Sequence, residues 1–319
     1  MNIIDALVLK SLKGVGDGSI TKLLEFTGNN GIFSLEELAK VGVENLPLRK
    51  VTKTLKEFLS LGEFEVERIH TKDELSAWNA QGVKVMYRHS EEYPKQILDL
   101  EDPPPFLFCK GNLSLLKNTR AIAVVGTRNN SPKGAIITTK TVEEFQNRKF
   151  IIVSGLALGV DTVAHKAALK FGAPTVAVLV DVSKISPATN KDLAEQIIQN
   201  DGLLVAENKP GTPTVAGLLA KRDRIQSGLS TAVFAIETSK NGGTMHAVRA
   251  AGKIRRPIFV PDAVAARYKD FSLDVIQGTQ YLLKEGVARA YTSESYESIS
   301  EELENISLRL NENYLSGLH

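Results

Sequence analysis

Three segments of the sequence combine glycine, hydroxyl and basic residues in a way that is typical of anion-binding loops. They are residues 126–134 (GTRNNSPKG), 154–161 (SGLALGVD) and 237–244 (ETSKNGGT). Glycines let a backbone approach an anion closely, and N–H and hydroxyl groups donate hydrogen bonds to its oxygens. A single loop of this kind is often no more than a tight turn, but three of them, with basic residues nearby, favour recognition of phosphate.

A fourth basic cluster, Lys221-Arg222-Asp223-Arg224, lies near the end of an expected helix. Arg222 and Arg224 are two positions apart, so they point to different sides of that helix. We expect one of them to pair with Asp223 or with a backbone carbonyl, and the other to face the anion. A basic surface that faces only water is the alternative.

These loops must be positioned by the regular part of the chain, in which short apolar segments alternate with helical ones. The apolar segments are residues 121–126, 150–154, 175–180, 203–206, 231–237 and 258–261, and the helical ones are residues 132–147, 161–171, 190–199, 214–226 and 243–251. Such an alternation predicts an α/β fold with a doubly wound parallel sheet, whose strands are buried on both faces. Ligands of these sheets bind outside the carboxyl ends of the strands, beside helix N-termini, and all three loops follow such an end.

Helical segments flank this region. Residues 3–60 show apolar residues at helical spacing around a Gly14-Val15-Gly16 turn, which resembles a helix-hairpin-helix element or is a plain glycine turn in a small bundle. Residues 293–310 predict one acidic terminal helix. We therefore expect an N-terminal helical domain of the helix-hairpin-helix or SAM-like kind at 1–62, a sheet domain at 63–292, and a C-terminal helix or tail at 293–319.

The charge of the chain is unevenly distributed. In 319 residues it carries 39 basic and 37 acidic side chains, a net charge of only +2. Residues 120–262 hold 19 basic and 11 acidic side chains, whereas the segments before and after are net acidic. Because the basic segment also carries every phosphate-like loop, it indicates an anionic partner, although a solvated basic surface would give the same pattern.

Several classes of protein are disfavoured. Cys109 is the single cysteine, so no internal disulfide forms and a reducing compartment is favoured. No apolar run reaches the ~18 residues of a membrane span and the N-terminus lacks signal-peptide features, so we expect a cytoplasmic protein without a membrane partner. No dinucleotide or P-loop fingerprint, metal-ligand spacing or catalytic base can be identified, and we expect no cofactor, no metal and no enzymatic activity.

An ordered set of short motifs points to a family. The motifs are Gly126-Thr127-Arg128 with Ser131, Ser154-Gly155-Leu156-Ala157 with Gly159, Asp161, Ala164 and His165, Arg222-Asp223-Arg224-Ile225 with Gly228-Leu229-Ser230, and Gly242-Gly243-Thr244 with Ala247. Upstream lie Tyr93-Pro94, Pro103-Pro104-Pro105 and Lys110-Gly111-Asn112, and downstream Val260-Pro261. In this order they resemble the DprA/Smf DNA-processing family, over about residues 3–290.

The resemblance implies an extended Rossmann-like domain that binds single-stranded DNA, forms a homodimer and helps to load the recombinase RecA during uptake or recombination of foreign DNA. It implies that Arg128, with Arg222 or Arg224, holds phosphates, while Asp161 anchors a loop or caps a helix and His165 is a core histidine. The expected phosphate-binding residues are Gly126, Thr127, Arg128, Ser131, Lys133, Ser154, Gly155, Lys184, Lys221, Arg222, Arg224, Lys240, Gly242, Gly243 and Thr244.

The sequence departs from the family pattern on the presumed binding edge. The family usually has Arg where Leu158 stands and Asn where Asp223 stands, and it has a basic residue near Ala188, for which Lys184 is a candidate substitute. These departures indicate altered DNA binding, or a specialised paralogue that acts in defence against foreign DNA.

Two classes of function follow. The leading hypothesis is a binding protein whose Arg and Lys neutralise phosphates, with steep salt dependence and little sequence preference, since no aromatic residue lies in the loops. The alternative is a nucleotide-binding or nucleotide-processing sensor or enzyme of a related hydrolase group, in which a Gly-Gly-x-Gly-Thr loop precedes a glutamate base. Here residues 241–244 are followed by Met245-His246-Ala247-Val248, without a carboxylate, so hydrolysis lacks its base.

Overall fold

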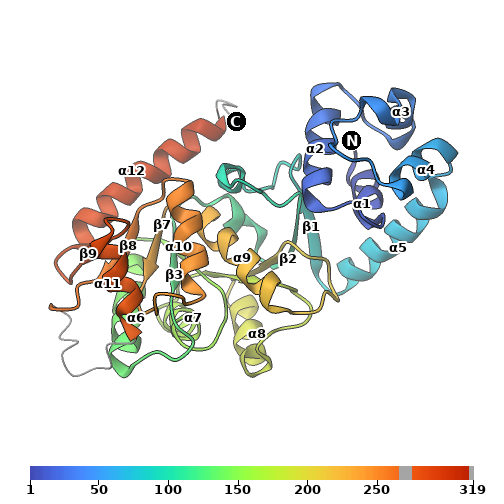
Figure 1. Ribbon diagram of the computed structural model, residues 1–319. Coiled ribbons are helices and arrows are strands. Elements are labelled where there is room, and N and C mark those ends of the chain that lie inside the picture. Colours follow the sequence, from blue (N-terminus) through green and yellow to red (C-terminus); the bar gives the residue numbers. More distant parts are fainter. Residues whose placement is uncertain (266–274, 316–319) are drawn as a thin grey trace. The chain divides into compact units, whose positions relative to one another are not determined.

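The computed structural model describes residues 1–265 and 275–315 (Figure 1). Contacts divide the chain into two compact units, Met1–His89 with Asp102–Phe106, and Ser90–Glu101 with Leu107–His319. The boundary expected at residue 62 lies inside the first unit, and the one expected at residue 292 lies inside the second. Whether those boundaries mark independently folding parts stays a prediction.

The first unit is a bundle of short helices followed by one strand. Its elements are α1 (Ile3–Ser11), α2 (Asp17–Asn29), α3 (Leu35–Val41), η1 (Val43–Asn45), α4 (Lys53–Leu61), α5 (Glu65–Ala80) and β1 (Val83–Tyr87). Side chains of Asn2, Ser34 and Thr52 cap the starts of α1, α3 and α4. The guanidinium of Arg68 on α5 holds the bundle together through the buried Asp5, at 2.7 Å. The expected N-terminal helical segment is thus confirmed.

The second unit is built on a mostly parallel sheet. Its strands are β2 (Phe106–Gly111), β3 (Ala121–Val125), β4 (Ile151–Ser154), β5 (Thr175–Leu179), β6 (Leu203–Ala206), β7 (Ala232–Ala235), β8 (Ile258–Pro261) and β9 (Arg289–Tyr291). They lie in the order β2-β6-β5-β4-β3-β7-β8-β9. From β3 the chain runs outward through β4, β5 and β6 and then returns to β7 on the other side of β3. The topological switch point therefore lies between β3 and β7, where such folds bind ligands.

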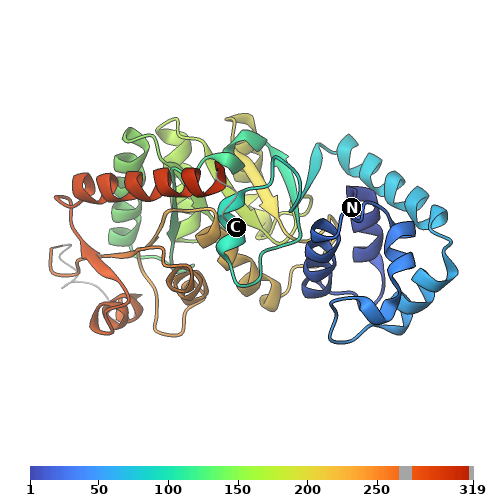
Figure 2. The ribbon, with the colours of Figure 1, turned by 90° about the horizontal axis from the view of Figure 1, so that it is seen from above.

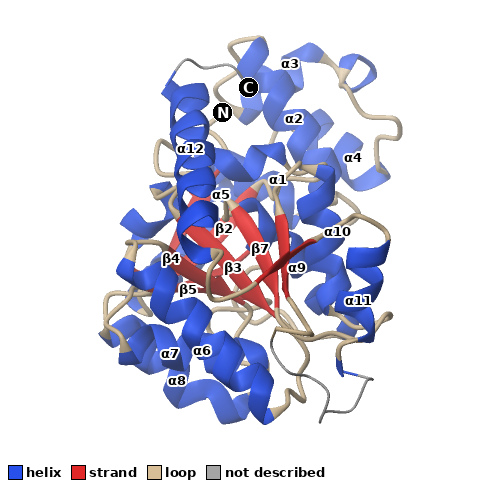
Figure 3. Ribbon diagram, turned by 90° about the vertical axis from the view of Figure 1, so that its left-hand side faces the viewer, coloured by secondary structure: helices blue, strands red, loops and turns tan. Residues whose placement is uncertain are grey.

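Helices cover both faces of this sheet (Figure 3). They are α6 (Pro132–Asn147), α7 (Val160–Lys170), α8 (Lys191–Gln199), α9 (Ala216–Gly228), α10 (Thr244–Lys253), α11 (Gln277–Lys284) and α12 (Tyr296–Leu315), with single turns η2 (Lys95–Asp99), η3 (Leu113–Lys117) and η4 (Ala188–Asn190). Successive residues of β3 point to opposite faces: Ile122 and Val124 pack with α6, α7 and α12, and Ala123 and Val125 pack with α10 and α11. The long α12, red in Figure 2, runs along the face that α6 and α7 cover.

The α/β fold with a doubly wound sheet is confirmed, and most expected strands agree with the structure to within one or two residues. The expectation of a mostly parallel sheet is met, but it did not specify two features at the edges. β2 pairs with β6 in the antiparallel direction, and β9 adds a parallel strand beyond β8. β9 has only three residues, of which Arg289 and Ala290 are exposed, so it lacks the apolar run that marked the other strands. Among the described residues no helix is long and apolar enough to cross a membrane.

Candidate anion-binding site

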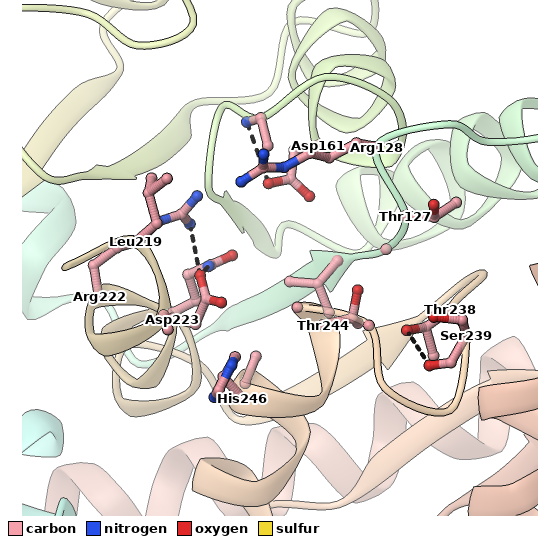
Figure 4. A pocket seen from close by; sticks show the side chains of 18 of the residues that line it. Thr127, Arg128, Asp161, Leu219, Arg222, Asp223, Thr238, Ser239, Thr244 and His246 are labelled. Carbon is pink, nitrogen blue, oxygen red and sulfur yellow. Dashed lines mark hydrogen bonds and ion pairs between the residues drawn. The ribbon is translucent and has the colours of Figure 1, made fainter. Parts of the chain in front are cut away.

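A pocket of about 500 Å³ lies at the switch point, outside the carboxyl ends of β3 and β7 (Figure 4). It lies within the second unit and is lined by the loop after β3, the start of α7, the face of α9, the loop after β7 and the first turn of α10. The lining residues that matter below are Gly126, Thr127, Arg128, Asp161, Arg222, Asp223, Gln226, Thr238, Ser239, Gly242, Gly243, Thr244 and His246. Seven of the fifteen expected phosphate-binding residues are among them.

The three expected loops meet because their backbones bind one another. The Thr127 N–H donates to the carbonyl of Glu237 at 2.7 Å, and the Val160 N–H donates to the carbonyl of Thr127 at 3.1 Å. Gly159 has a φ of +78°, and a Cβ there would come within 2.2 Å of the Thr127 carbonyl oxygen. Only glycine suits this position, so the family motif reflects the packing of two loops.

Arg222 is the buried cation of the pocket. It is 4% exposed, its Nη2 donates to the carbonyl of Gly155 at 2.9 Å, and its Nη1 lies 3.2 Å from Oδ1 of Asp223. Nε and Nη1 nevertheless have no hydrogen-bond partner among the described residues. A buried guanidinium with unused N–H donors can bind an anion strongly, because little water competes for it.

Arg224 and Lys221 are held away from this pocket. Nη1 and Nη2 of Arg224 donate to the carboxylate of Glu207, at 2.9 and 2.8 Å. The Lys221 ammonium lies 3.0 Å from the same carboxylate. Glu207 itself is buried at the end of β6. Nη1 of Arg224 also donates to the carbonyl of Lys221 at 2.9 Å, so one arginine pairs with a backbone carbonyl and the other, Arg222, lines the pocket, as expected. Arg222 in addition pairs with Asp223, and its contact with an anion stays a prediction.

Buried carboxylates already bind two of the predicted anion-binding loops. At the start of α6, the Ser131 N–H and hydroxyl donate to Glu237 at 2.9 and 2.5 Å, and the Gly134 N–H donates to the Ser131 hydroxyl. In the loop after β4, Asp161 accepts from the N–H groups of Gly155 and Ala157. The N–H groups of both loops therefore already have acceptors within the protein. Asp161 anchors its loop, as predicted.

The N-terminus of α10, like that of α7, has no side-chain cap. Gly242, Gly243 and Thr244 bring its first turn to the pocket. A helix start carries partial positive charge, although the N–H groups of Met245 and His246 in this turn already donate to the carbonyls of Gly242 and Gly243, at 3.1 and 2.9 Å. Together with Arg222 and Arg128, which has no hydrogen-bond or ion-pair partner among the described residues, it forms a site suited to one phosphate.

The remaining expected residues lie elsewhere. Ser154 is buried and donates to the carbonyl of Val124 at 2.7 Å, so it supports the sheet. Lys184 is exposed beside a small separate depression that Gly155 and Arg222 also line. The Lys240 ammonium lies 4.4 Å from the ring centroid of Tyr281. Neither these residues nor Lys133 and Ser131 line the pocket, so their contact with phosphate stays a prediction.

Burial controls the protonation of the neighbouring groups. Burial lowers the pKa of His165 to about 3, and Nδ1 of its imidazole lies 2.8 Å from the Thr175 hydroxyl, as expected of a neutral core histidine. Burial raises the pKa of Asp161 to about 6, although the Arg222 guanidinium opposes this shift. Burial also raises the pKa of Asp223, against the charges of Arg222 and Arg128.

Several lining residues were missed by the sequence analysis, among them Gln226, Thr238, Ser239 and His246. Gln226 lies four residues after Arg222 on α9, so helical spacing alone could have placed it on the same face. No comparable signal exists for His246, whose position depends on how α10 meets the sheet.

A doubly wound sheet with a pocket at its switch point, and without a dinucleotide fingerprint, defines a Rossmann-like α/β protein with a candidate anion-binding site. Residues 84–304 match the family model described as DNA recombination-mediator protein A. A relative, the DNA processing protein DprA of Bacillus subtilis, is 31% identical over 217 residues, which cover 67% of this chain and 73% of that protein.

Solved structures agree with this match. The DprA structure from Streptococcus pneumoniae has a TM-score of 0.76 at 28% identity and covers 93% of this chain and 96% of its own. The DprA structure from Helicobacter pylori, whose report concerns that protein's binding of single-stranded DNA, has a TM-score of 0.60 at 27% identity and covers 70% of this chain and 96% of its own. The chain belongs to the DNA recombination-mediator protein A family. The resemblance to DprA/Smf is therefore confirmed, and with it a role in DNA processing and recombination.

Proposed function

We propose that this protein binds single-stranded DNA through the switch-point pocket, with a backbone phosphate between Arg128, Arg222 and the start of α10. The observation that carries the proposal is the buried Arg222, whose Nε and Nη1 have no hydrogen-bond partner among the described residues. It lines the same pocket as the uncapped start of α10. The Helicobacter pylori relative, which binds single-stranded DNA, supports the choice of ligand.

Binding of this kind draws its free energy from counterion release. Each phosphate that a cation neutralises on a single strand contributes a slope of about −0.7 to the dependence of log affinity on log salt concentration. None of the residues lining the pocket is Phe, Tyr or Trp, so base stacking contributes little there. The proposal therefore predicts a salt-sensitive interaction dominated by a few phosphate contacts, with Lys184 and Lys240 as further contacts outside the pocket.

The proposal extends to the partners of the protein. We propose that the chain acts as a homodimer in the cytoplasm and assists the loading of RecA onto the bound strand, by binding and without catalysis. Membership of a recombination-mediator family supports this role. Light scattering of the purified protein tests the dimer, and stimulation of RecA filament formation on coated single strands tests the partnership.

Fluorescence anisotropy with labelled oligo-dT tests the site. Arg128→Ala and Arg222→Ala are expected to weaken binding, and Arg128→Ala is expected to reduce the salt slope by about 0.7. Arg309→Ala, on the exposed side of α12, is the matched control and leaves binding unchanged. Thermal melting shows whether each variant is folded.

Wild-type affinity in both pocket variants, or affinity that does not change with salt, would refute the phosphate site. Incubation with free nucleotides separates binding from the alternative class of function. Release of a base or phosphate would show a nucleotide-processing enzyme instead.

A further inference from the structure

Beside Arg222, the α9 wall of the pocket presents two hydrogen-bond acceptors, the side chains of Asp223 and Gln226, which do not bind phosphate. Asp223 lines the pocket with its side chain 15% exposed. Its two partners, Nε2 of Gln226 at 3.0 Å and Nη1 of Arg222 at 3.2 Å, both lie against Oδ1. Among the described residues Oδ2 has no hydrogen-bond partner, so this oxygen is available to a ligand.

Gln226 adds a second acceptor. Its Nε2 donates to the Asp223 carboxylate, which fixes the orientation of the amide and leaves Oε1 as the other atom. Oε1 is buried and has no hydrogen-bond partner among the described residues, and Gln226 lines the same pocket. Oε1 of Gln226 and Oδ2 of Asp223 are thus two neighbouring acceptors without donors, which indicates that a ligand could supply hydrogen-bond donors here.

Arg128 and the N-terminus of α10 line the pocket from other elements, whereas Arg222 lies on α9 beside Asp223. In Figure 4 Asp223 lies on one side of the pocket, and Thr127 lies on the other side. A ligand that fits both walls must carry an anionic group and, a few ångströms away, neutral N–H donors. A nucleotide has this arrangement, with its phosphate at one end and the Watson–Crick edge of its base at the other.

We infer that the α9 wall reads the base of one nucleotide in the bound strand and selects guanine, through the acceptors of Asp223 and Gln226. This inference rests on the proposed binding of single-stranded DNA. Guanine carries two neighbouring donors, the N1 imino group and the N2 amino group, which would be shared between Oδ2 of Asp223 and Oε1 of Gln226. Thymine offers one imino donor, and adenine and cytosine offer one amino group each. Asp223 is therefore a specificity-determining residue in an otherwise sequence-tolerant interaction.

The experiment compares short oligo-dT strands with one central guanine, one central inosine, or thymine throughout. Inosine keeps the N1 imino group and O6 of guanine but lacks the N2 amine. A hydrogen bond to a charged acceptor corresponds to about a tenfold change in affinity or more, so wild-type protein is expected to bind the guanine strand about tenfold more tightly than the inosine strand.

Asp223→Asn keeps the shape of the side chain but removes the charged acceptor. It is expected to bring the guanine and inosine strands to within about twofold of each other. The readout is this ratio of two affinities within one variant, because Asp223 also lies 3.2 Å from Arg222, and removing its charge alters the affinity for every strand alike. Asp192→Asn, an exposed carboxylate in the first turn of α8, is the matched control and keeps the preference.

Equal affinity of wild-type protein for the guanine and inosine strands, or an unchanged preference in Asp223→Asn, would overturn base reading while leaving DNA binding intact. A preference that vanishes with Asp223→Asn but not with Asp192→Asn supports it. Failure of the wild-type protein to bind any of the three strands would overturn the proposed function as well.

Discussion

Gly155→Ala adds one methyl group against the guanidinium of Arg222 and therefore tests how closely the two residues pack. A Cβ on Gly155 would lie 1.7 Å from Nη1 and 2.4 Å from Cζ of Arg222, far inside any contact distance. Since the guanidinium is almost fully buried, it cannot swing into solvent without breaking its bond to the Gly155 carbonyl. Lost packing and a lost charged hydrogen bond together correspond to about 3 kcal/mol of unfolding free energy.

A double-mutant cycle isolates this contact. In Arg222→Ala protein the clash is absent, so Gly155→Ala should cost less than about 0.5 kcal/mol there, which leaves a coupling energy of about 2–3 kcal/mol. Urea denaturation measures the four unfolding free energies, and anisotropy measures the affinity for oligo-dT. Gly217→Ala on α9, where nothing lies within 4 Å of the new methyl, is the control and should not destabilise.

Additive effects of the two changes would refute the reasoning, because they would mean that Gly155 and Arg222 do not share space. Full DNA affinity in a folded Gly155→Ala protein would refute the placement of Arg222 as a phosphate ligand.

Three further changes test an ion pair, a buried histidine and a helix cap. Glu207→Ala removes the carboxylate that holds Arg224 and should lower the unfolding free energy by about 3 kcal/mol in urea denaturation; no loss would show that the pair is dispensable. His165→Asn tests whether this histidine stays neutral in the folded protein, where its pKa is lowered to about 3. Between about pH 6.5 and pH 3 only the unfolded chain binds the proton, so the unfolding free energy of the wild type should fall by up to about 1.4 kcal/mol for each unit that the pH decreases. The variant should show a shallower fall. An identical pH dependence would contradict a neutral histidine. Ser131→Ala should cost about 1–2 kcal/mol in thermal melting, since α6 loses its cap and Glu237 loses a donor, and an unchanged melting temperature would count against both roles.

The sheet could be predicted from the sequence because its inner strands are short, β-branched and apolar, as in Ala121–Val125. A strand that is buried on both faces is apolar along its whole length, whatever its position in the order of the sheet. β9 could not be predicted, because an edge strand of three residues with exposed side chains carries no such pattern.

The candidate site was only partly predictable. Glycine-rich loops after strands can be recognised locally, and they did converge. The partner of each cation depends on distances that the sequence does not contain: Glu207 is 17 residues from Arg224, and Glu237 is 106 residues from Ser131. Helix propensity and motif spacing therefore indicated where cations gather, but not which of them the protein neutralises internally.

The small side chains on the α10 face of the sheet have a mechanical consequence. Ala123 and Ala235 on the strands and Ala247 and Ala251 on the helix belong to one buried cluster, which Met245 and Val248 of the same helix complete. Ser227 on α9 also donates to the carbonyl of Ala247 at 2.8 Å, which ties the two helices that line the pocket. Two walls of the proposed site for phosphate and base are thus tied to each other before a ligand binds, which lowers the cost of ordering them on binding. We therefore expect that most of the conformational entropy lost on binding is lost by the DNA strand and not by the protein.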